Sequence, residues 1–293
     1  MNEFIDTIDV LGEQEFRKEF FARTLTEFRD SHLTSVASTM LRGFSALSII
    51  DLPNCKILGG YPFSGCSKLL SVNLPYISST TDYLFAYTGI SSTDCIPPQF
   101  STTIVAEMFS MCKNLSGELR LDPGIETIRS SAFTGTAITR IDSPYIKYLY
   151  QYAFASCSKL EYVNLPNYIP PYSYSNYCFS GCTNLTEAYM PALPAIPVGL
   201  LADCAISTFS IPIASIIWGS AFLRCSNLST VYIGQDSCSL NTSGAFAGTK
   251  ITFATGSIYV PASRVDYYRN STNWNWFSTQ IKGYDYENDR PVD

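Results

Sequence analysis

The sequence has little charge and almost no histidine. Only 15% of its 293 residues are Asp, Glu, Lys or Arg, the formal net charge is −6, and no run of basic residues occurs. Because binding to a phosphate backbone needs clustered Lys and Arg, we do not expect nucleic acid as a partner. No apolar stretch reaches the roughly 18 residues that can cross a bilayer, so we expect no membrane insertion.

Catalytic and cofactor motifs are also missing. A Ser-His-Asp or Cys-His site could be built only around His32, the one histidine. Phosphate-binding glycine motifs of the GxxxxGK[ST] and GxGxxG types are absent. The acidic residues that a glycosidase would need, such as Glu118 and Asp142, fall at positions expected to face solvent. We therefore expect a protein that is not an enzyme and that has no cofactor and no metal site.

What the sequence has instead is one phrase repeated along its length. FSGCSKLLSVNLP at 63–75 reads almost the same as FASCSKLEYVNLP at 154–166. Related phrases give about ten units, spaced by roughly 21 to 25 residues, which begin at residues 41, 63, 85, 109, 133, 154, 179, 201, 222 and 246. Units this short cannot bury a core alone, so neighbouring units are expected to stack into a solenoid.

Each unit predicts one strand and one tight turn. In LEYVNLP at 160–166, apolar and polar residues alternate, which is typical of a strand with one buried face. The proline then ends the strand, because it has no N–H to donate. The turn, ASCSK or SGCSK, is rich in small residues and suits a short helical or 3-10 turn. Stacked units would place equivalent strands about 4.8 Å apart in a parallel sheet.

Ten cysteines are present, and most of them follow the repeat. Three residues after an aromatic residue or leucine, six units carry Cys66, Cys112, Cys157, Cys182, Cys204 and Cys225. Other units have Phe44, Thr88, Thr136 or Thr249 at this position, so it accepts small or apolar groups and needs no partner. We therefore expect buried free thiols, which behave as small hydrophobes, and synthesis in a reducing compartment.

The repeated pattern I…AF…C…L…V…LP resembles the leucine-rich repeats of the BspA type, over roughly residues 32–261. As in that family, a long form, CSKL, alternates with a short form, TAI or CAI. The segment at 257–287 also resembles the carboxy-terminal segment of many such proteins. The resemblance implies a BspA-like leucine-rich-repeat solenoid, made mainly of short parallel β-strands with short helical or 3-10 turns.

Both ends of such a solenoid need a cover, and we expect helical caps at both ends. Near the amino terminus, apolar residues recur at helical spacing, namely Phe16, Phe20, Phe21, Leu25 and Phe28. This helix either seals the first coil or anchors the protein to a partner or to copies of itself. The expected organisation is a helical cap or anchor segment over 1–31, a solenoid of about ten repeats over 32–261, and a helical cap with a polar tail over 262–293.

The outward positions of the predicted strands mark a candidate binding surface. They are charged and amide-rich toward the amino end of the chain and aromatic toward the carboxy end. Tyrosine combines a large rigid contact area with a hydrogen-bonding tip, which suits protein and sugar ligands alike. The candidate binding residues are Arg120, Asp142, Tyr162, Asn164, Tyr189, Tyr232 and Tyr259.

The resemblance also implies a role. Members of the family are mostly surface proteins of bacteria, and of some parasitic protists, implicated in adhesion. The opening MNEFIDTIDVLG lacks the basic start and apolar run of a secretory signal. With RTLTEF before the first repeat, it resembles proteins encoded among structural genes of phages of gut bacteria.

We therefore expect a recognition or adhesion module on a phage virion, in the tail or on the capsid, that binds a host surface protein or glycan. Two alternatives stay open. One is a structural or decoration protein of the virion, which contacts other virion proteins or itself through the amino-terminal helix. The other is a bacterial BspA-like adhesin on the cell surface.

Overall fold

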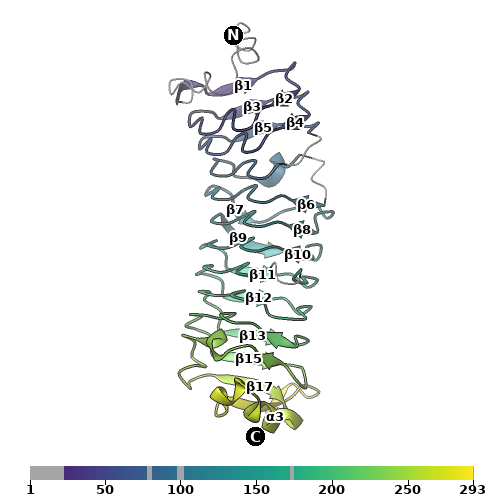
Figure 1. Ribbon diagram of the computed structural model, residues 1–293, viewed down its shortest axis with the longest axis vertical. Helices are drawn as coiled ribbons and strands as arrows, with labels where there is room; N and C mark the ends of the chain where they lie inside the picture. The colour runs from purple at the N-terminus through teal and green to yellow at the C-terminus, as the bar shows by residue number, and fades with distance from the viewer. Residues whose placement is uncertain (1–22, 78–80, 98–101, 172–174, 293) are drawn as a thin grey trace.

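Most repeats contribute one short strand to a common flank, and the equivalent strands of most successive repeats pair in parallel. The coils stack into one elongated solenoid of about eleven turns, with the first and last described residues at opposite ends of the long axis (Figure 1). The computed structural model describes residues 23–77, 81–97, 102–171 and 175–292. It confirms the parallel-strand solenoid that the repeats predict.

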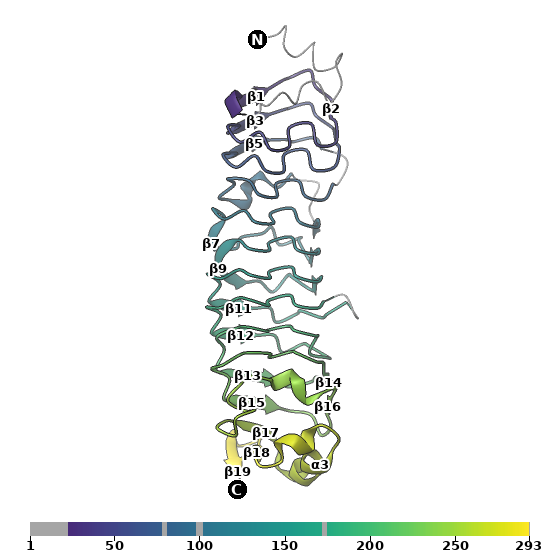
Figure 2. The same cartoon turned by 60° about the vertical axis from the view of Figure 1, so that its left-hand side comes forward.

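The first flank carries three sheets. They are β1 (Glu27–Arg29), β3 (Ile49–Asp51) and β5 (Ser71–Asn73); β7 (Ser116–Glu118), β9 (Ala137–Asp142), β11 (Tyr162–Asn164) and β12 (Glu187–Tyr189); and β13 (Thr208–Ile211), β15 (Thr230–Ile233), β17 (Ser257–Pro261), β18 (Ile281–Asp285) and β19 (Arg290–Val292). Figure 2 shows these strands in one column along the molecule. We call the side formed by their outward-pointing residues the strand face.

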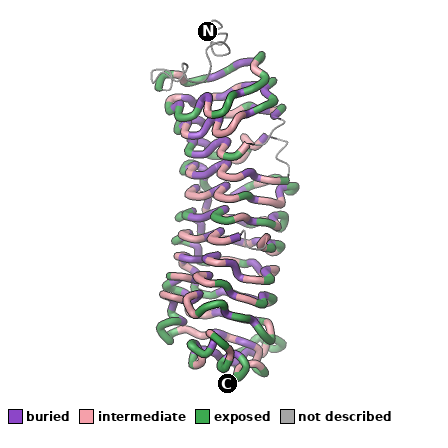
Figure 3. The backbone as a smooth tube through the Cα atoms, in the orientation of Figure 1, coloured by how far each residue is buried: buried purple, intermediate pink, exposed green. Residues whose placement is uncertain are grey.

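A second flank runs along the other side of the coils. It consists of two-residue strands, namely β2 (Ser35–Val36) with β4 (Ile57–Leu58), β6 (Thr103–Ile104) with β8 (Thr127–Ile128) and β10 (Tyr148–Leu149), and β14 (Ile216–Ile217) with β16 (Ser239–Leu240). The second residue of each of these strands is buried. The core therefore lies between the two flanks and runs the length of the solenoid (Figure 3).

The register of the first flank keeps like residues in line. Val163 of β11 is fully buried between the partly exposed Tyr162 and Asn164, and it pairs with Ile141 and Ala188 of the neighbouring coils. Because strand side chains alternate between faces, a slip by one residue would turn the buried row to solvent. The alternation seen in the sequence is thus what fixes the register.

A column of phenylalanines fills the centre of the core. Neighbouring rings in this column have centroids 5.2–6.2 Å apart. The column contains Phe63, Phe85, Phe109, Phe133, Phe154 and Phe179, all with no exposed surface. Aromatic pairs contribute about 0.5–1.5 kcal/mol each beyond the burial of their area, so the column stabilises these six coils against one another.

The cysteines form a second column, as the sequence predicts. All ten are free, and all but the half-buried Cys95 are buried. At the repeat position each thiol lies 2.9–3.2 Å from a backbone carbonyl oxygen of the preceding coil; Cys157, for example, donates to Phe133. Where threonine takes this place, as at Thr136, its hydroxyl donates to the same kind of carbonyl in its own coil. The position thus suits a small group that can donate one hydrogen bond.

One coil has no strand at its place in the first flank. Between β5 and β7 the chain forms the 3-10 turn η1 (Thr93–Cys95), which begins where the hydroxyl of Ser92 accepts a hydrogen bond from the N–H of Asp94 at 3.1 Å. Since no strand occupies this position, β5 and β7 belong to separate sheets. The strand face is therefore interrupted at this coil.

The amino end differs from the prediction. Phe28 lies in β1, paired with Ile50 of β3, and Leu25 is a half-buried residue outside any helix that packs against the core. Pairing on the first flank therefore starts at Glu27, five residues before the expected boundary, and the predicted helix does not include these two residues. Phe16, Phe20 and Phe21 lie outside the described residues.

The carboxy end is closed by short helical segments and by strands together. After β17 come η4 (Ala262–Arg264), α3 (Val265–Asn270) and η5 (Trp274–Phe277), and β18 then extends the sheet while β19 returns antiparallel to it. Trp274 is buried, and its indole N–H donates to the carbonyl of Cys238 at 2.6 Å. Trp276, two positions later, is 74% exposed. The helical cap that the sequence predicts is thus not what closes this end, because strands β18 and β19 take part as well.

Candidate binding face

The seven predicted binding residues fall into two groups on the strand face. The central group lies on and beside β7, β9, β11 and β12, and comprises Arg120, Asp142, Tyr162, Asn164 and Tyr189. The carboxy-terminal group, Tyr232 and Tyr259, lies on β15 and β17. The structure therefore places all seven residues on the strand face, but it separates them into two places with different chemistry.

Two rows of side chains cross the central group. The strand register places Asp142, Asn164 and Tyr189 opposite one another on three successive coils. The same register places Arg140 opposite Tyr162. Because paired parallel strands lie about 4.8 Å apart, side chains in one row touch their neighbours.

Asp142 is the centre of the hydrogen bonding in this group. Its Oδ1 accepts a hydrogen bond from the side-chain amide of Asn164 at 2.9 Å, and its Oδ2 accepts one from Arg140 at 2.6 Å. The hydrogen bond to Asp142 is the main cause that raises the pKa of Arg140. The guanidinium of Arg140 also lies 3.6 Å from the ring centroid of Tyr162. Three side chains are thus held in fixed positions around one carboxylate.

In the row of Asp142, Asn164 and Tyr189, the amide of Asn164 is the last group before the aromatic residue. Its Oδ1 is buried and has no hydrogen-bond partner among the described residues. An amide on the next coil could donate to this oxygen, but the next residue in the row is Tyr189. The chemistry of the face therefore changes here from carboxylate and amide to aromatic, and Tyr189 is 56% exposed.

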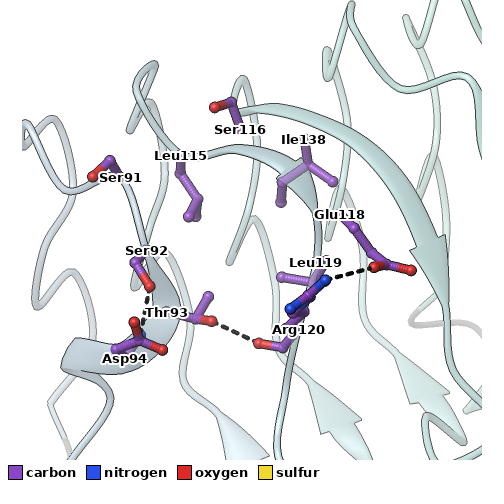
Figure 4. A pocket seen from close by; sticks show the side chains of 10 residues that line it. All are labelled: Ser91, Ser92, Thr93, Asp94, Leu115, Ser116, Glu118, Leu119, Arg120 and Ile138. Carbon is purple, nitrogen blue, oxygen red and sulfur yellow. Dashed lines mark hydrogen bonds and ion pairs between the residues drawn. The ribbon is translucent and has the colours of Figure 1, made fainter.

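Two cavities open beside the central group. The first, about 250 Å³, lies between the η1 coil, with Ser92, Thr93 and Asp94, and the following coil, with Glu118 and Arg120 (Figure 4). The second, about 220 Å³, lies on the other side of Arg120. It is lined by Glu118, Arg120, Asp142 and Tyr145, among others. Both cavities thus share Glu118 and Arg120.

Arg120 is held by its backbone and leaves its side chain in solvent. Its carbonyl oxygen accepts a hydrogen bond from the hydroxyl of Thr93 at 2.6 Å. The side chain is 85% exposed, and among the described residues its guanidinium makes one contact, at 3.5 Å, to Glu118. A guanidinium has five N–H donors in a rigid plane, so most of its hydrogen-bonding capacity is available to a ligand.

Charges of both signs alternate across the central group. Asp94, Glu118 and Asp142 are acidic, and Arg120 and Arg140 are basic. The face therefore offers carboxylate acceptors next to guanidinium donors, with no net positive field that would attract polyanions. Such an arrangement suits a ligand that both donates and accepts hydrogen bonds.

The carboxy-terminal group is a packed aromatic cluster. Tyr232 and Tyr259 stack at 5.1 Å, and Tyr284 meets both rings at a steep angle, with centroids 5.1 and 5.5 Å away. The hydroxyl of Tyr284 donates to Asp289 at 2.8 Å, and this hydrogen bond raises the pKa of Tyr284 to about 12. Tyr232 and Tyr259 are only half exposed, so they stabilise the end of the sheet as well as facing solvent.

Several residues of the face were not among the predicted binding residues. Glu118 and Arg140 stand at outward strand positions of the same repeats, so the repeat alignment carried the signal for them. Thr93 and Asp94 belong to the coil without a strand, and no local pattern points to their place beside Arg120. Tyr284 lies in β18, within the predicted polar tail, where the alternation in IKGYD is a strand signal.

His32 lies in a bend, and its side chain is 97% exposed. Nowhere in the described parts of the chain do three or more His, Cys, Asp or Glu gather in a way that could hold a metal ion. No helix among the same residues is long and apolar enough to span a membrane.

A family of repeat proteins matches most of the chain. The family model "BspA type Leucine rich repeat region (6 copies)" matches the chain over residues 3–116, 78–192 and 147–274. No curated protein matches it.

Three solved structures are similar to it. A leucine-rich repeat protein from Bacteroides ovatus is 17% identical, with a TM-score of 0.46 and coverage of 90% of this chain and 85% of that one. A leucine rich cell surface protein from Faecalibacterium prausnitzii is 18% identical, with a TM-score of 0.42 and coverage of 84% of this chain and 79% of that one. The pneumococcal vaccine antigen PcpA is 14% identical, with a TM-score of 0.45 and coverage of 90% of this chain and 84% of that one. Because the repeat model matches well over half of its residues, this chain belongs to the BspA-type leucine-rich-repeat family.

Proposed function

We propose that this protein is a non-catalytic recognition module that binds a surface protein or a glycan through the central group of its strand face. One observation carries the proposal: the guanidinium of Arg120 stands between two cavities, mostly exposed, with a single 3.5 Å contact to Glu118. An exposed cation in a polar hollow is a natural point for a ligand to bind.

The scaffold supports this role. The backbone of the central group lies in or immediately beside strands whose inward residues are buried in a continuous core, so the points from which its side chains project are fixed before a ligand arrives. Preorganised groups lose less conformational entropy on binding. Repeat solenoids present such groups along an extended surface, which is how this class of architecture binds large partners.

Hydrogen bonding, not proton transfer, is what the charged residues of the face are arranged for. Asp142 is bound by Arg140 and Asn164, and Glu118 lies within 3.7 Å of Arg140 and 3.5 Å of Arg120. Carboxylate oxygens accept hydrogen bonds, so Asp142 and Glu118 offer acceptors to a ligand.

The binding test compares two variants. Arg120→Ala removes the guanidinium between the cavities, and Lys159→Ala removes an exposed cation from the turn that precedes β11 and lines neither cavity. Labelled protein is applied to a panel of intact bacteria and to a printed glycan array. We expect Arg120→Ala to weaken binding by about tenfold, the loss of one charge-assisted hydrogen bond, and Lys159→Ala to leave it unchanged. Equal binding by wild type and Arg120→Ala would contradict the proposal.

The place where this face is displayed is a second proposal. Family membership supports a bacterial surface adhesin. The virion setting rests on the opening segment, of which residues 1–22 lie outside the described structure. Mass spectrometry of isolated cell envelopes and of purified phage particles from the source separates the two settings. Enrichment in envelopes supports the adhesin, and stoichiometric incorporation into particles supports a virion protein.

Assembly through the opening segment is a proposal of the same kind. The full chain and a chain without residues 1–22 are compared by light scattering for self-association. Their incorporation into particles or envelopes is compared as well. If the shortened chain behaves like the full chain in both measurements, the segment is not an anchor.

A further inference from the structure

The four polar residues at the heart of the central group recur elsewhere in the chain. Glu27, Arg29, Asp51 and Asn73 stand 91 positions before Glu118, Arg120, Asp142 and Asn164, respectively. We call the first four the amino-terminal station and the last four the central station. The nearly identical phrases at 63–75 and 154–166 have the same offset, so a block of four coils is repeated, and its outward polar residues are repeated with it.

The two stations have the same internal contact. In the amino-terminal station the amide of Asn73 donates to Asp51 Oδ1 at 2.8 Å, and in the central station the amide of Asn164 donates to Asp142 Oδ1 at 2.9 Å. Asp51 and Asn73 are opposite one another in parallel strands, as are Asp142 and Asn164. The stations are therefore alike in three dimensions and not only in sequence.

A single substitution within the block accounts for their difference. Where the central station has Arg140, the amino-terminal station has Ile49, again 91 positions earlier. In the absence of a competing arginine, Arg29 reaches Asp51 Oδ2 at 3.1 Å. In the central station Arg140 occupies the equivalent oxygen, and Arg120 is left in solvent. The side chain of Arg29 is still 51% exposed, so both stations present a guanidinium to solvent.

The geometry places the stations in line. Four coils separate them, which at about 4.8 Å per coil is a distance of roughly 19 Å along the axis. Both views show β1, β3 and β5 on the same side of the solenoid as β7, β9 and β11 (Figure 1, Figure 2). Two like sets of groups thus face one direction at a fixed interval, an arrangement that suits a chain molecule with a repeating unit.

The chemistry of the stations favours hydroxyl groups. Each station has two carboxylates, one amide and one guanidinium, so donors and acceptors lie side by side. A hydroxyl group can donate to the carboxylates and accept from the guanidinium. A polyanion, in contrast, would be repelled by two carboxylates at each station. The cavities beside Arg120, about 250 and 220 Å³, fall below the roughly 300 Å³ at which pockets for drug-sized molecules begin, and so fit one small ring.

We propose that the two stations bind one unbranched neutral polysaccharide, with contacts roughly 19 Å apart along its length. This rests on the proposed function and names the ligand class for the same face. Once one station holds the chain, the second station binds it at a high effective concentration. Affinity therefore depends on the length of the ligand, and a ligand too short to reach both stations binds weakly.

The test uses titration calorimetry with graded neutral oligosaccharides. Cello-, malto-, xylo- and chito-oligosaccharides of about two to eight units are used, together with the long polymers of each series. The variants are Asp51→Ala with Asn73→Ala, for the amino-terminal station, and Asp142→Ala with Asn164→Ala, for the central one. Ser210→Ala, at an exposed outward position of β13, is the control on the same face. Circular dichroism checks that each variant is folded.

We expect at least one series to bind the wild type about tenfold or more tightly once its members span both stations. Either double variant removes this gain, and the Ser210→Ala control keeps it. If the amino-terminal variant binds long chains like the wild type while the central variant does not, the second station is wrong and the proposed function stands. If cells bind through Arg120 but no oligosaccharide or polymer does, the ligand class is wrong. If no substitution on the face affects any binding, both proposals fail.

Discussion

The guanidinium of Arg140 lies 3.6 Å from the centroid of the Tyr162 ring, and its Nη2 lies 2.6 Å from Asp142 Oδ2. Arg140 is thus held from two sides, by a neighbouring ring and by a carboxylate on its own strand. This arrangement keeps Arg140 on Asp142 and leaves Arg120 exposed. The first prediction concerns the exchange between these two arginines.

The substitution Arg140→Ile is expected to convert the central station into the form of the amino-terminal one, which has Ile49 at the equivalent position. With Arg140 removed, Arg120 should turn to Asp142, as Arg29 does to Asp51 at 3.1 Å. A crystal structure of the variant checks this directly. Since exposed ion pairs contribute about 0–1 kcal/mol, the free energy of unfolding should change little.

The same variant makes a functional prediction. With its guanidinium engaged, Arg120 has fewer donors to offer, so ligand binding should weaken although Arg120 itself is unchanged. Arg224→Ile, which breaks the exposed ion pair to Asp203, is a suitable control for the loss of one arginine. Arg120 remaining in solvent in the variant structure would contradict this account of the difference between the stations.

The repeated strands and the core could be predicted from sequence because both follow from short-range patterns. The alternation in LEYVNLP identifies Val163 as buried, and the spacing of the phrase identifies Phe154 and Cys157 as residues that stack from coil to coil. Within the repeats, only the backbone conformation of the turns could not be predicted in detail. Tyr152 and Ser156, on either side of Phe154, both have positive φ, of 58° and 59°, which no residue preference predicts.

The ends and the site depend on contacts that a local pattern does not contain. Phe28 matches a helical period with Leu25 and a strand period with Glu27 and Arg29, and only pairing with β3 decides between them. Arg120 was recognised as outward-facing, but the first of its two cavities lies against a neighbouring coil that forms η1 instead of a strand. The sequence of that coil still aligns with the repeat, so the missing strand could not be predicted from it.

Buried thiols should be unreactive in the folded protein. Burial raises the pKa of Cys66, Cys178 and Cys225 to about 12, so almost no thiolate is present near pH 8. We expect iodoacetamide at pH 8 to label the native protein very slowly, and to label all ten cysteines in denaturant. Mass spectrometry of the alkylated peptides measures this. Rapid labelling of these three residues in the native state would show that the coils open locally.

The same thiols should make stability depend on alkaline pH. In the unfolded chain a thiol loses its proton near pH 8.5, whereas burial raises the pKa of Cys66 and Cys225 to about 12 in the fold. The stabilisation is therefore complete below about pH 8.5 and is lost as the pH rises toward 12. Each such thiol lowers the free energy of unfolding by about 1.4 kcal/mol per pH unit in that window.

Urea unfolding between about pH 8 and pH 11 measures this slope. Because tyrosines ionise in the same range, Cys66→Ala provides the comparison that isolates one thiol. Its slope should be shallower than that of the wild type by about one proton's contribution. Identical slopes in the two proteins would mean that Cys66 does not differ in pKa between the folded and unfolded states.

Two tryptophans of the carboxy-terminal cap should differ sharply in their effect on stability. Trp274 is 1% exposed, packs against Tyr268 at 5.5 Å and donates to Cys238, whereas Trp276 is 74% exposed. Trp274→Ala leaves a cavity at the end of the core and an unpaired carbonyl, so it should lower the free energy of unfolding by about 3–5 kcal/mol. Trp276→Ala should change it by less than about 0.5 kcal/mol.

Urea denaturation followed by circular dichroism measures both variants, and each serves as the control for the other because the same residue type is removed two positions apart. A solenoid loses its end coil first when that end is uncovered, since each coil is stabilised by its neighbours. The Trp274→Ala transition should therefore begin in the last coils, with earlier hydrogen exchange at Ile258 of β17 than at Val163 of β11. If the amides of Ile258 and Val163 exchanged equally early in this variant, Trp274 would be stabilising the whole chain and not its carboxy end.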